Sequence, residues 1–294
     1  MTPSPPTSPP PAVRRLTLAD LDACVALAAD CGWPPEHHKW RLLLAAGRGY
    51  GIDAAAGDGP AGGLIAAVVV TPYGREAASV GMMLVASRHQ RRGLGERLLR
   101  TALERCATEA VFLTATDRGR PLYERLGFKP VGAVTTLRGA FAPAGGQAAG
   151  GVAVRAATAA DLPGVLAYDL PAFGADRTPL LTRLPAFSDR FLVAERPGGG
   201  LAGYAARWPN AETAVAGPVL ADDEAVARAL ITALAAGSDA PLRFDADDRH
   251  PRLAAWLRAS GLAETARCTL MVLGAPGLPG DPARRFAPYS LALG

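Results

Sequence analysis

The sequence predicts an α/β (α+β) protein built from two related domains, each with a mixed, mainly antiparallel sheet flanked by helices. Three observations lead to this fold class. Apolar, β-branched segments alternate with amphipathic helical segments. Short turns join the middle strands, which therefore pair antiparallel. A pattern near the start of the chain also recurs after its midpoint. The 294 residues suffice for two domains that each bury a core.

The recurring pattern marks the beginning of each half. Residues 13–21 contain Val-Arg, then Thr, then Ala-Asp-Leu, and residues 154–162 contain the same letters at the same spacing. Each copy predicts a short strand, a threonine helix cap and an apolar helix. Later elements recur in the same order, which favours a duplicated fold.

Low-complexity segments set the predicted domain boundaries. Residues 1–12 hold six prolines and predict a disordered tail. Residues 142–151, rich in Ala and Gly, predict a linker. The expected domains are therefore residues 13–141 and 152–274, followed by a Pro- and Gly-rich tail, residues 275–294, without a clear role.

The elements of the first domain follow from hydrophobic periodicity. Residues 63–71 and 78–85 are almost entirely β-branched or small and apolar, which is typical of buried strands. Residues 94–107 carry Leu98, Leu99 and Ala102 on one side and predict an amphipathic helix. The predicted strands are 13–16, 49–54, 63–71, 78–85, 110–115 and 131–137, and the predicted helices are 18–30, 36–46, 94–107 and 120–126.

Composition excludes several function classes. The net charge of +4 and pI of about 9.1 come without basic clusters beside aromatic residues, so nucleic acid is not an expected partner. The four cysteines lack metal-ligand spacing, and no metal is expected. No apolar run approaches the roughly 20 residues of a membrane span, and no signal-peptide pattern is present. The cytoplasm follows by elimination.

The most informative segment runs from the strand at 78–85 into the helix at 94. It contains Gln90-Arg91-Arg92-Gly93-Leu94-Gly95. The first amides of a helix have no intrahelical partner, and the helix dipole adds partial positive charge there. Glycines let an anion approach the backbone closely. The segment therefore predicts a pyrophosphate site.

Two motifs carry a resemblance to a known family. Gln90-x-x-Gly93-x-Gly95 after an apolar strand resembles the acyl-CoA-binding motif of the GNAT N-acetyltransferase superfamily. Pro121 to Phe128, with Tyr123 and a closing Gly-Phe, resembles its second signature. The resemblance implies tandem GNAT-like domains in which the first is catalytic.

A narrower resemblance covers both halves. Gly32-Trp33 ahead of Trp40, the run from Thr116 to Tyr123, and Phe173 to Arg177 are similar to a two-domain bacterial GNAT group with a variant C-terminal domain. That group often carries Asp-Ala-Thr where this chain has Thr114-Ala115-Thr116, so no role follows for a carboxylate there.

The family resemblance implies direct transfer of an acetyl group from acetyl-CoA to a primary amine of a small molecule or peptide. Tyr123 matches the position of the general acid that protonates the leaving thiolate. A backbone amide near Met83 to Val85 is a candidate oxyanion donor. The expected cofactor-binding residues are Met83, Leu84, Val85, Gln90, Arg91, Arg92, Gly93, Leu94, Gly95, Glu96 and Tyr123.

The general base remains open between Glu76, Asp117, one of His37 and His38, and a water molecule. An amine must lose a proton before it attacks, and either carboxylate could accept one. The acceptor site is expected beside the segment that joins the first two helices. Its candidate residues are Trp33, His37, Trp40, Tyr73 and, from the second half, Arg177.

The second half departs from the pattern at its corresponding loop. Asp222-Asp223-Glu224 replaces the basic turn, and three carboxylates at a helix start would occupy its amides and repel phosphate. At a spacing of 135 residues, Gly93 falls on Arg228. This half is expected to cover the acceptor cleft or to mediate dimerisation, which leaves monomer and homodimer open. The alternative functions are a non-catalytic acyl-CoA-binding regulator and a protein-lysine acetyltransferase.

Overall fold

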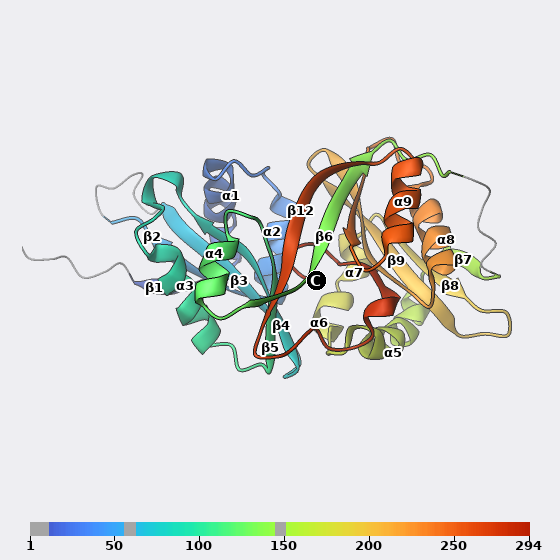
Figure 1. Cartoon of the computed structure of the whole chain (residues 1–294), viewed down its shortest axis with the longest axis horizontal. Coiled ribbons are helices and arrows are strands. Elements are labelled where there is room, and N and C mark those ends of the chain that lie inside the picture. The colour runs from blue at the N-terminus through green and yellow to red at the C-terminus, as the bar shows by residue number, and fades with distance from the viewer. Residues whose placement is uncertain (1–11, 56–62, 145–150) are drawn as a thin grey trace, which may run out of the picture.

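A computed structural model describes residues 12–55, 63–144 and 151–294 of the chain. Two halves lie side by side, and the C-terminus lies between them at the centre of the molecule (Figure 1). Most of the predicted N-terminal tail (1–12) and most of the predicted linker (142–151) lie outside the described residues.

The first half contains the predicted strands and helices. Strand β3 (Leu64–Tyr73) is buried along nearly its whole length, as its β-branched and small apolar residues predict. Helix α3 (Leu94–Glu104) buries Leu98, Leu99 and Ala102 on its apolar side. The remaining elements are β1 (Val13–Leu16), η1 (Leu18–Asp20), α1 (Leu21–Asp30), α2 (His37–Ala46), β2 (Arg48–Asp53), β4 (Ala77–Val85), η2 (Ser87–His89), β5 (Ala110–Ala115), α4 (Arg120–Arg125) and β6 (Lys129–Gly139).

The second half repeats this order. Thr17 and Thr158 each form a capping box with an aspartate three residues later, so the repeated sequence pattern has the same local structure in both copies. The elements are β7 (Ala153–Ala156), η3 (Ala159–Asp161), α5 (Leu162–Phe173), α6 (Thr178–Leu181), α7 (Leu184–Phe187), β8 (Arg190–Glu195), β9 (Leu201–Asn210), β10 (Thr213–Ala221), α8 (Glu224–Ala235), β11 (Leu242–Asp247), α9 (Pro251–Ala259), β12 (Ala263–Leu273), η4 (Pro282–Arg284) and β13 (Arg285–Ala287).

The described strands form one continuous sheet rather than two separate ones. Its order is β1-β2-β3-β4-β5-β12-β6-β11-β10-β9-β8-β7, with β13 beside β10. Among the pairs of the described strands, β4–β5 and β10–β11 are parallel and the others are antiparallel. The mixed, mainly antiparallel character is therefore as predicted.

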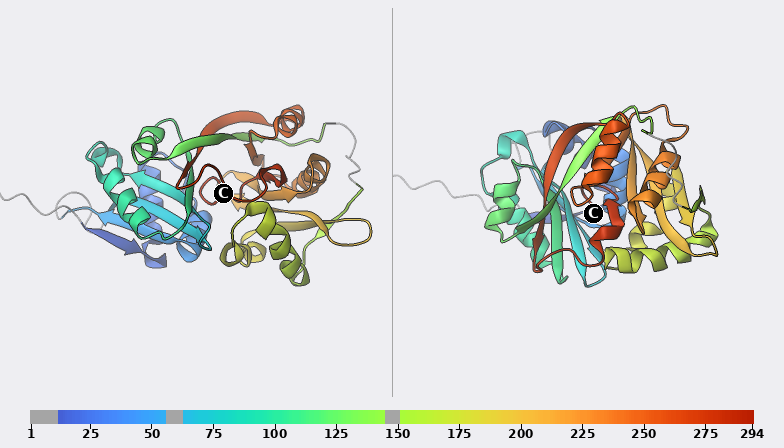
Figure 2. Two further views of the ribbon diagram at one scale, coloured as in Figure 1. Left: turned by 60° about the horizontal axis from the view of Figure 1, so that its bottom comes forward. Right: turned by 45° about the vertical axis from the view of Figure 1, so that its right-hand side comes forward.

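The halves are joined by an exchange of their last strands. β12 belongs to the second half in sequence but lies between β5 and β6, while β6 pairs with β11 of the second half. Figures 1 and 2 show β6 and β12 running together across the junction. Across the β6–β11 pair, the Thr136 hydroxyl donates to Asp245 at 2.7 Å. Each half is thus completed by a strand of the other.

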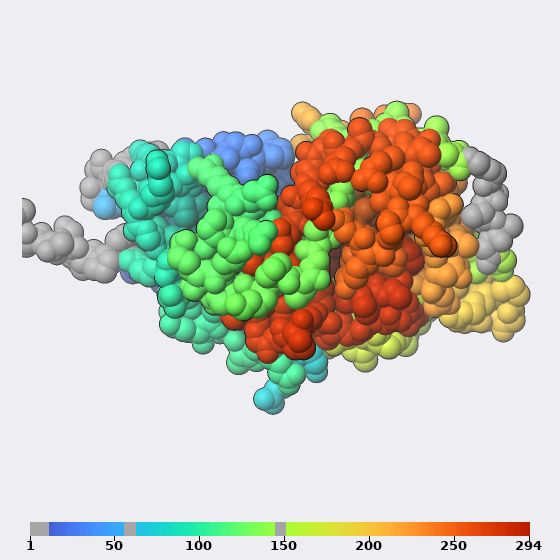
Figure 3. All heavy atoms as spheres, in the orientation of Figure 1, coloured from blue at the N-terminus to red at the C-terminus, as the bar shows by residue number. Residues whose placement is uncertain are grey.

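The C-terminal segment has a structural role that the sequence does not reveal. Residues 275–294, predicted as a tail without a clear role, contain β13 and end in the junction between the halves (Figure 1). Figure 3 shows red atoms of the C-terminal part of the chain packed against green atoms of the first half. Thr114 and Tyr73 donate hydrogen bonds to the carbonyl oxygens of Leu291 and Leu293, and Trp208 donates to that of Tyr289. These contacts use main-chain acceptors, so side-chain periodicity gives no sign of them.

Candidate active site

A bulge in β4 opens the sheet of the first half. Gly81 pairs with Val69 and Leu84 with Ala67, so Met82 and Met83 together face the single residue Val68. Met82 has a φ of 51°, which is uncommon for a residue with a side chain. β4 pairs with β5 only along residues 77–79, and beyond that point the two strands separate. The β5-facing edge of β4 near Leu84 has no strand partner in the described chain.

The loop after β4 leads directly to an uncapped helix. Gly93 has a left-handed φ of 76°, and no side chain caps α3. Free space surrounds the position where a Cβ of Gly93 would lie. A Cβ on Gly95 would contact Met83, Val85 and Leu122, so the helix start lies close to β4. The first amides of α3 therefore face an open site with partial positive charge.

The loop is held in place by the protein itself. The Gln90 amide group donates to the Val85 carbonyl oxygen at 3.0 Å, and its oxygen accepts from Arg118. The Ser87 backbone amide donates to the Asp30 carboxylate at 2.7 Å. Gln90 was predicted to bind the cofactor, but both ends of its side chain brace the loop. An anion would meet a preformed site here.

The bulge and the loop border one cleft of about 710 Å³. Most of the predicted cofactor-binding residues meet there, together with Trp33 from the α1–α2 segment. Arg92 belongs to the same loop but does not line the cleft. The lining residues are Cys31, Trp33, Met83, Leu84, Val85, His89, Gln90, Arg91, Gly93, Leu94, Gly95, Glu96, Thr116, Arg118, Gly119, Leu122 and Arg125.

Tyr123 lies directly behind this cleft on α4. Its side chain is buried, and its ring packs edge-to-face on Phe128 with centroids 5.9 Å apart. Gly119 and Leu122, which line the cleft, are its neighbours on the same turn and helix. No described residue hydrogen-bonds to the hydroxyl group. Burial raises the pKa of Tyr123 to about 12, so the hydroxyl keeps its proton at neutral pH.

Two family models match the chain, one in each half. Both are described as acetyltransferase (GNAT) domains, and they cover residues 54–130 and 165–287. The uncharacterized N-acetyltransferase YitH of Bacillus subtilis (strain 168) is 31% identical over 242 residues, which are 81% of this chain and 83% of that protein. The chain belongs to the GNAT acetyltransferase family.

Solved GNAT structures share the two-half fold. A Pyrococcus horikoshii protein, provisionally described as an acetyltransferase, matches with a TM-score of 0.77 and 18% identity over 96% of this chain and 95% of its own. A GCN5-related N-acetyltransferase from Sphaerobacter thermophilus matches with a TM-score of 0.62 and 20% identity, over 91% and 97% of the two chains. A tandem GNAT protein from the clavulanic acid biosynthesis pathway matches with a TM-score of 0.62 and 17% identity, over 90% and 99%. At these identities the likeness concerns the fold.

The two carboxylates among the candidate bases of this GNAT protein lie at opposite ends of their strands. Glu76 directly precedes β4, so about nine residues of extended chain, or about 30 Å, separate it from the loop beyond Val85. Its prediction as a base is therefore wrong. Asp117 follows β5 as an exposed residue, next to Thr116 in the cleft wall. It remains the carboxylate candidate.

The acceptor prediction is partly corrected. Trp33 is 38% exposed and lines the cleft, and His37 is exposed at the start of α2. Trp40 is fully buried in the core, because it lies on the inner side of α2. Tyr73 is buried as well, and its hydroxyl bonds to Ser79 and Leu293.

Arg177 is also not free to meet an acceptor amine. It is buried and forms two hydrogen bonds with the Asp169 carboxylate, at 3.1 and 2.5 Å. A guanidinium that is buried beside its own counter-ion serves the structure, and it is not available to a ligand. Its third side contacts the carbonyl oxygen of Gly294 at 3.1 Å.

A buried charged cluster at the junction escaped prediction. Glu36 and Lys39 form an ion pair at the start of α2, and Arg243 pairs with Asp245 on β11 at 3.1 Å. Desolvation lowers the pKa of Lys39, which Glu36 partly offsets. The polar spacing of Glu36 and Lys39 at the head of a helix was the available signal. Their partners could not be foreseen, because the strand exchange brings β11 to this place.

The second half carries the same bulge but a different loop. Gly217 and Pro218 lie opposite Ala206, as the two methionines lie opposite Val68. α8 follows β10 after residues 222–223 alone, so the counterpart of Gly93 is Asp223 and not Arg228. The Asp223 carboxylate accepts from the amide of Val226 at 2.9 Å, as the acidic sequence predicts.

Within the described ranges, no cluster of three or more His, Cys, Asp or Glu side chains has a metal-binding arrangement. No helix of the described residues combines the length and apolar character that a membrane crossing requires.

Proposed function

We propose that the first half transfers an acetyl group from acetyl-CoA to a primary amine of a small molecule or peptide. One observation carries the proposal. The uncapped start of α3 and the unpaired edge of a bulged β4 border the same cleft. An anionic donor with a strand-like arm needs both features at once.

The donor's pyrophosphate would bind the amides at Leu94, Gly95 and Glu96. Gly93 supplies the space and the turn, and the helix dipole supplies the attraction. Arg91, which lines the cleft, adds a full positive charge. The Glu96 carboxylate lines the cleft but pairs with Arg100 at 2.9 Å, so its negative charge is partly neutralised. The residues present therefore fit a diphosphate.

The bulge sets up the reacting centre. The unpaired edge near Leu84 would hold the pantetheine arm by main-chain hydrogen bonds. The Met83 amide is the candidate donor to the oxyanion, since the bulge turns it out of the β3–β4 ladder. In the second half the corresponding residue is Pro218, which has no N–H to donate.

Tyr123 is the proposed general acid. Its pKa of about 12 keeps the phenol protonated while the leaving thiolate, whose thiol has a pKa of roughly 8.5, develops beside it. A protonated phenol can donate a hydrogen bond and then the proton to sulfur. The incoming amine loses its proton to Asp117 or to water, and Trp33 and His37 border its approach.

A thiol-release assay tests the function. The protein is mixed with acetyl-CoA and a panel of amines, and free thiol and the N-acetyl product are both measured. Amine-dependent thiol release with a matching product is the expected result. Acetyl-CoA binding without thiol release for any amine or protein lysine would contradict catalysis and favour an acyl-CoA-binding regulator.

A further inference from the structure

The C-terminal segment of the second half crosses the gap between β4 and β5 on one face of the sheet. The Thr114 hydroxyl of β5 donates to the carbonyl oxygen of Leu291 at 2.6 Å. The next residue, Ala292, packs on Gly81 of β4. Residues 291–292 therefore reach from one strand to the other, close to the point where the two strands separate.

The contact between Ala292 and Gly81 leaves no spare volume. A Cβ added to Gly81 would lie 2.6 Å from the Cβ of Ala292 and 2.8 Å from its carbonyl oxygen. Both distances are well below the roughly 3.5 Å at which carbon atoms make ordinary contact. Gly81 directly precedes Met82 and Met83 of the bulge. The bulge therefore borders a wall that the second half supplies.

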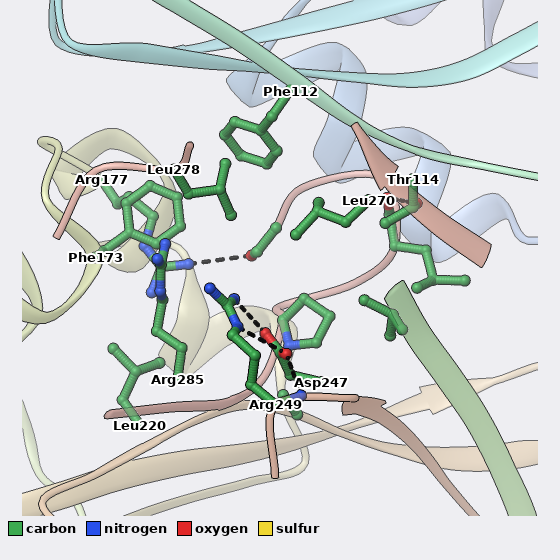
Figure 4. A pocket seen from close by; sticks show the side chains of 15 residues that line it. Phe112, Thr114, Phe173, Arg177, Leu220, Asp247, Arg249, Leu270, Leu278 and Arg285 are labelled. Atoms are coloured by element: carbon green, nitrogen blue, oxygen red, sulfur yellow. Dashed lines mark hydrogen bonds and ion pairs between the residues drawn. The ribbon is translucent and has the colours of Figure 1, made fainter. Parts of the chain in front are cut away.

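This wall is fixed from both halves. The Tyr73 hydroxyl of β3 donates to the carbonyl oxygen of Leu293. From the second half, Arg177 donates to the main-chain oxygen of Gly294 at 3.1 Å (Figure 4). Arg177 is itself held by the Asp169 carboxylate. The residues on either side of Ala292 are thus anchored, so the alanine cannot easily move away from β4.

The proposed donor arm would bring its acyl group towards this wall. A Cβ on Gly95 would contact Val85 and Met83, so the arm leaves the pyrophosphate site beside these two residues. Because β4 runs towards the loop before α3, an arm that leaves α3 passes Val85 first and then reaches the Met83 amide. The acyl chain then points towards Gly81, two residues or about 7 Å further along the strand.

The other sides of the gap are closed as well. Residues 77–79 of β4 pair with β5, so the gap ends there. Val85 and Gly81 lie on opposite faces of the sheet, because their partners Ala66 and Val69 are three residues apart on β3. Val85 lies beside the start of α3, which therefore covers the face opposite Ala292. An acyl chain in the gap is enclosed.

We propose that Ala292 is a specificity-determining residue that closes the acyl subsite of the first half and limits the donor to acetyl and propionyl groups. The proposal rests on the proposed function, because it places the thioester carbonyl group at the Met83 amide. Of the length between Met83 and Gly81, ordinary contact takes about 3.5 Å. The remainder suits one or two carbon atoms beyond the carbonyl group.

Donors of increasing chain length test the subsite. Acetyl-, propionyl-, butyryl- and hexanoyl-CoA are compared by thiol release with one amine acceptor, and their affinities are measured by calorimetry. One methylene group in a pocket of this kind changes kcat/KM by roughly 10-fold or more. The parent chain should therefore use acetyl- and propionyl-CoA, lose about 10-fold in kcat/KM with butyryl-CoA, and fail to use hexanoyl-CoA.

Two substitutions at one position should shift this profile in opposite directions. Ala292→Gly removes a methyl group from the wall and should raise kcat/KM for butyryl-CoA, relative to acetyl-CoA, by about 10-fold. Ala292→Val adds two methyl groups and should lower the value for propionyl-CoA, relative to acetyl-CoA, by a similar factor. Ala283→Gly, an exposed change in η4 of the same segment, should keep the parent profile. Ratios between donors are independent of the amount of folded protein.

Two results would overturn the proposal while the proposed function stands. One is equal use of acetyl- and hexanoyl-CoA by the parent chain, and the other is an unchanged profile in Ala292→Gly. The glycine variant decides the matter if Ala292→Val does not fold. If the parent chain binds acyl-CoA but transfers no acyl group, the proposed catalysis fails, and the affinities for the four donors then test the subsite by themselves.

Discussion

The two halves build the same bulged strand and then use the space beside it differently. In the first half, residues 86–93 connect β4 to α3 and leave the helix amides open. In the second half, residues 222–223 connect β10 to α8, and Asp223 occupies an amide of the helix. The fold therefore does not by itself make a donor site. A donor site also requires a long loop before the helix and a helix start that no side chain caps.

The edge of the bulged strand shows the same contrast. Leu84 of β4 has no partner on its β5 side within the described chain, whereas Val219 and Leu220 of β10 pair with β13. β13 thus lies where a pantetheine arm would lie in an active half. The second half fills its own cleft with protein, and the first half leaves room for a ligand.

The largest effect is expected from a substitution in the loop before α3. Gly93→Glu places a carboxylate at the anion site and forces a left-handed φ of 76° on a residue with a Cβ. Acetyl-CoA binding, measured by calorimetry, should fall below detection. Gly198→Glu is the matched control, because Gly198 has a φ of 91° and open space but lies far from the site in sequence and sheet. Unchanged binding in Gly93→Glu would refute the pyrophosphate site.

Removing a buried side chain of β13 should lower the stability of the protein and leave acetyl-CoA binding intact. Phe286 of β13 is buried and stacks on His250 with centroids 4.1 Å apart. Phe286→Ala should lower the free energy of unfolding by about 3–5 kcal/mol, measured by urea denaturation. The Kd for acetyl-CoA should change less than twofold in protein that is still folded. A large loss of donor affinity would show that β13 supports the first half instead.

Removing the phenol tests the active half directly. Tyr123→Phe should lower kcat by about 10²-fold at unchanged donor affinity, as loss of a general acid does. Because burial raises the pKa of Tyr123 to about 12, this group should cause no alkaline fall in kcat below pH 10. Tyr168→Phe is the matched control, since that hydroxyl donates to Ala202 and Asp222 of the second half. Equal kcat values for the parent and Tyr123→Phe would remove the acid assignment.

The smallest effect on stability is expected from the residue that caps helix α8 in the second half. Asp223→Ala removes the side chain that caps α8 and should destabilise the protein by about 1 kcal/mol, read from the denaturation midpoint. It should not create a second acetyl-CoA site, because β13 still occupies the edge of β10. A calorimetric stoichiometry that rises from one to two would contradict this account of the filled half.

Local sequence patterns predicted the parts of the structure that depend on local interactions. Strand β5 has its predicted bounds, and α3 begins at Leu94 as expected. The threonine caps and the acidic cap of α8 also follow from neighbouring residues. Each of these features is set by residues a few positions apart, which is the range over which periodicity and capping act.

Features made by distant contacts were missed. Nothing in residues 263–273 marks them as a strand of the first half, since any strand with that pattern could pair on either side. Trp40 and Tyr73 were expected at the acceptor site because aromatic residues serve both in sites and in cores, and only their packing distinguishes the two. The hydrogen bonds of the C-terminal segment use backbone acceptors, which every sequence supplies.

The exchange of β6 and β12 has a consequence for biosynthesis. While the ribosome is still translating the second half, the first half has its donor loop and its tyrosine helix but lacks the strand beside β5. That edge remains open until residues 263–273 leave the exit tunnel. We therefore expect the nascent chain to reach its active fold only after the second half has been synthesised. A premature stop codon in the second half would also inactivate the first half.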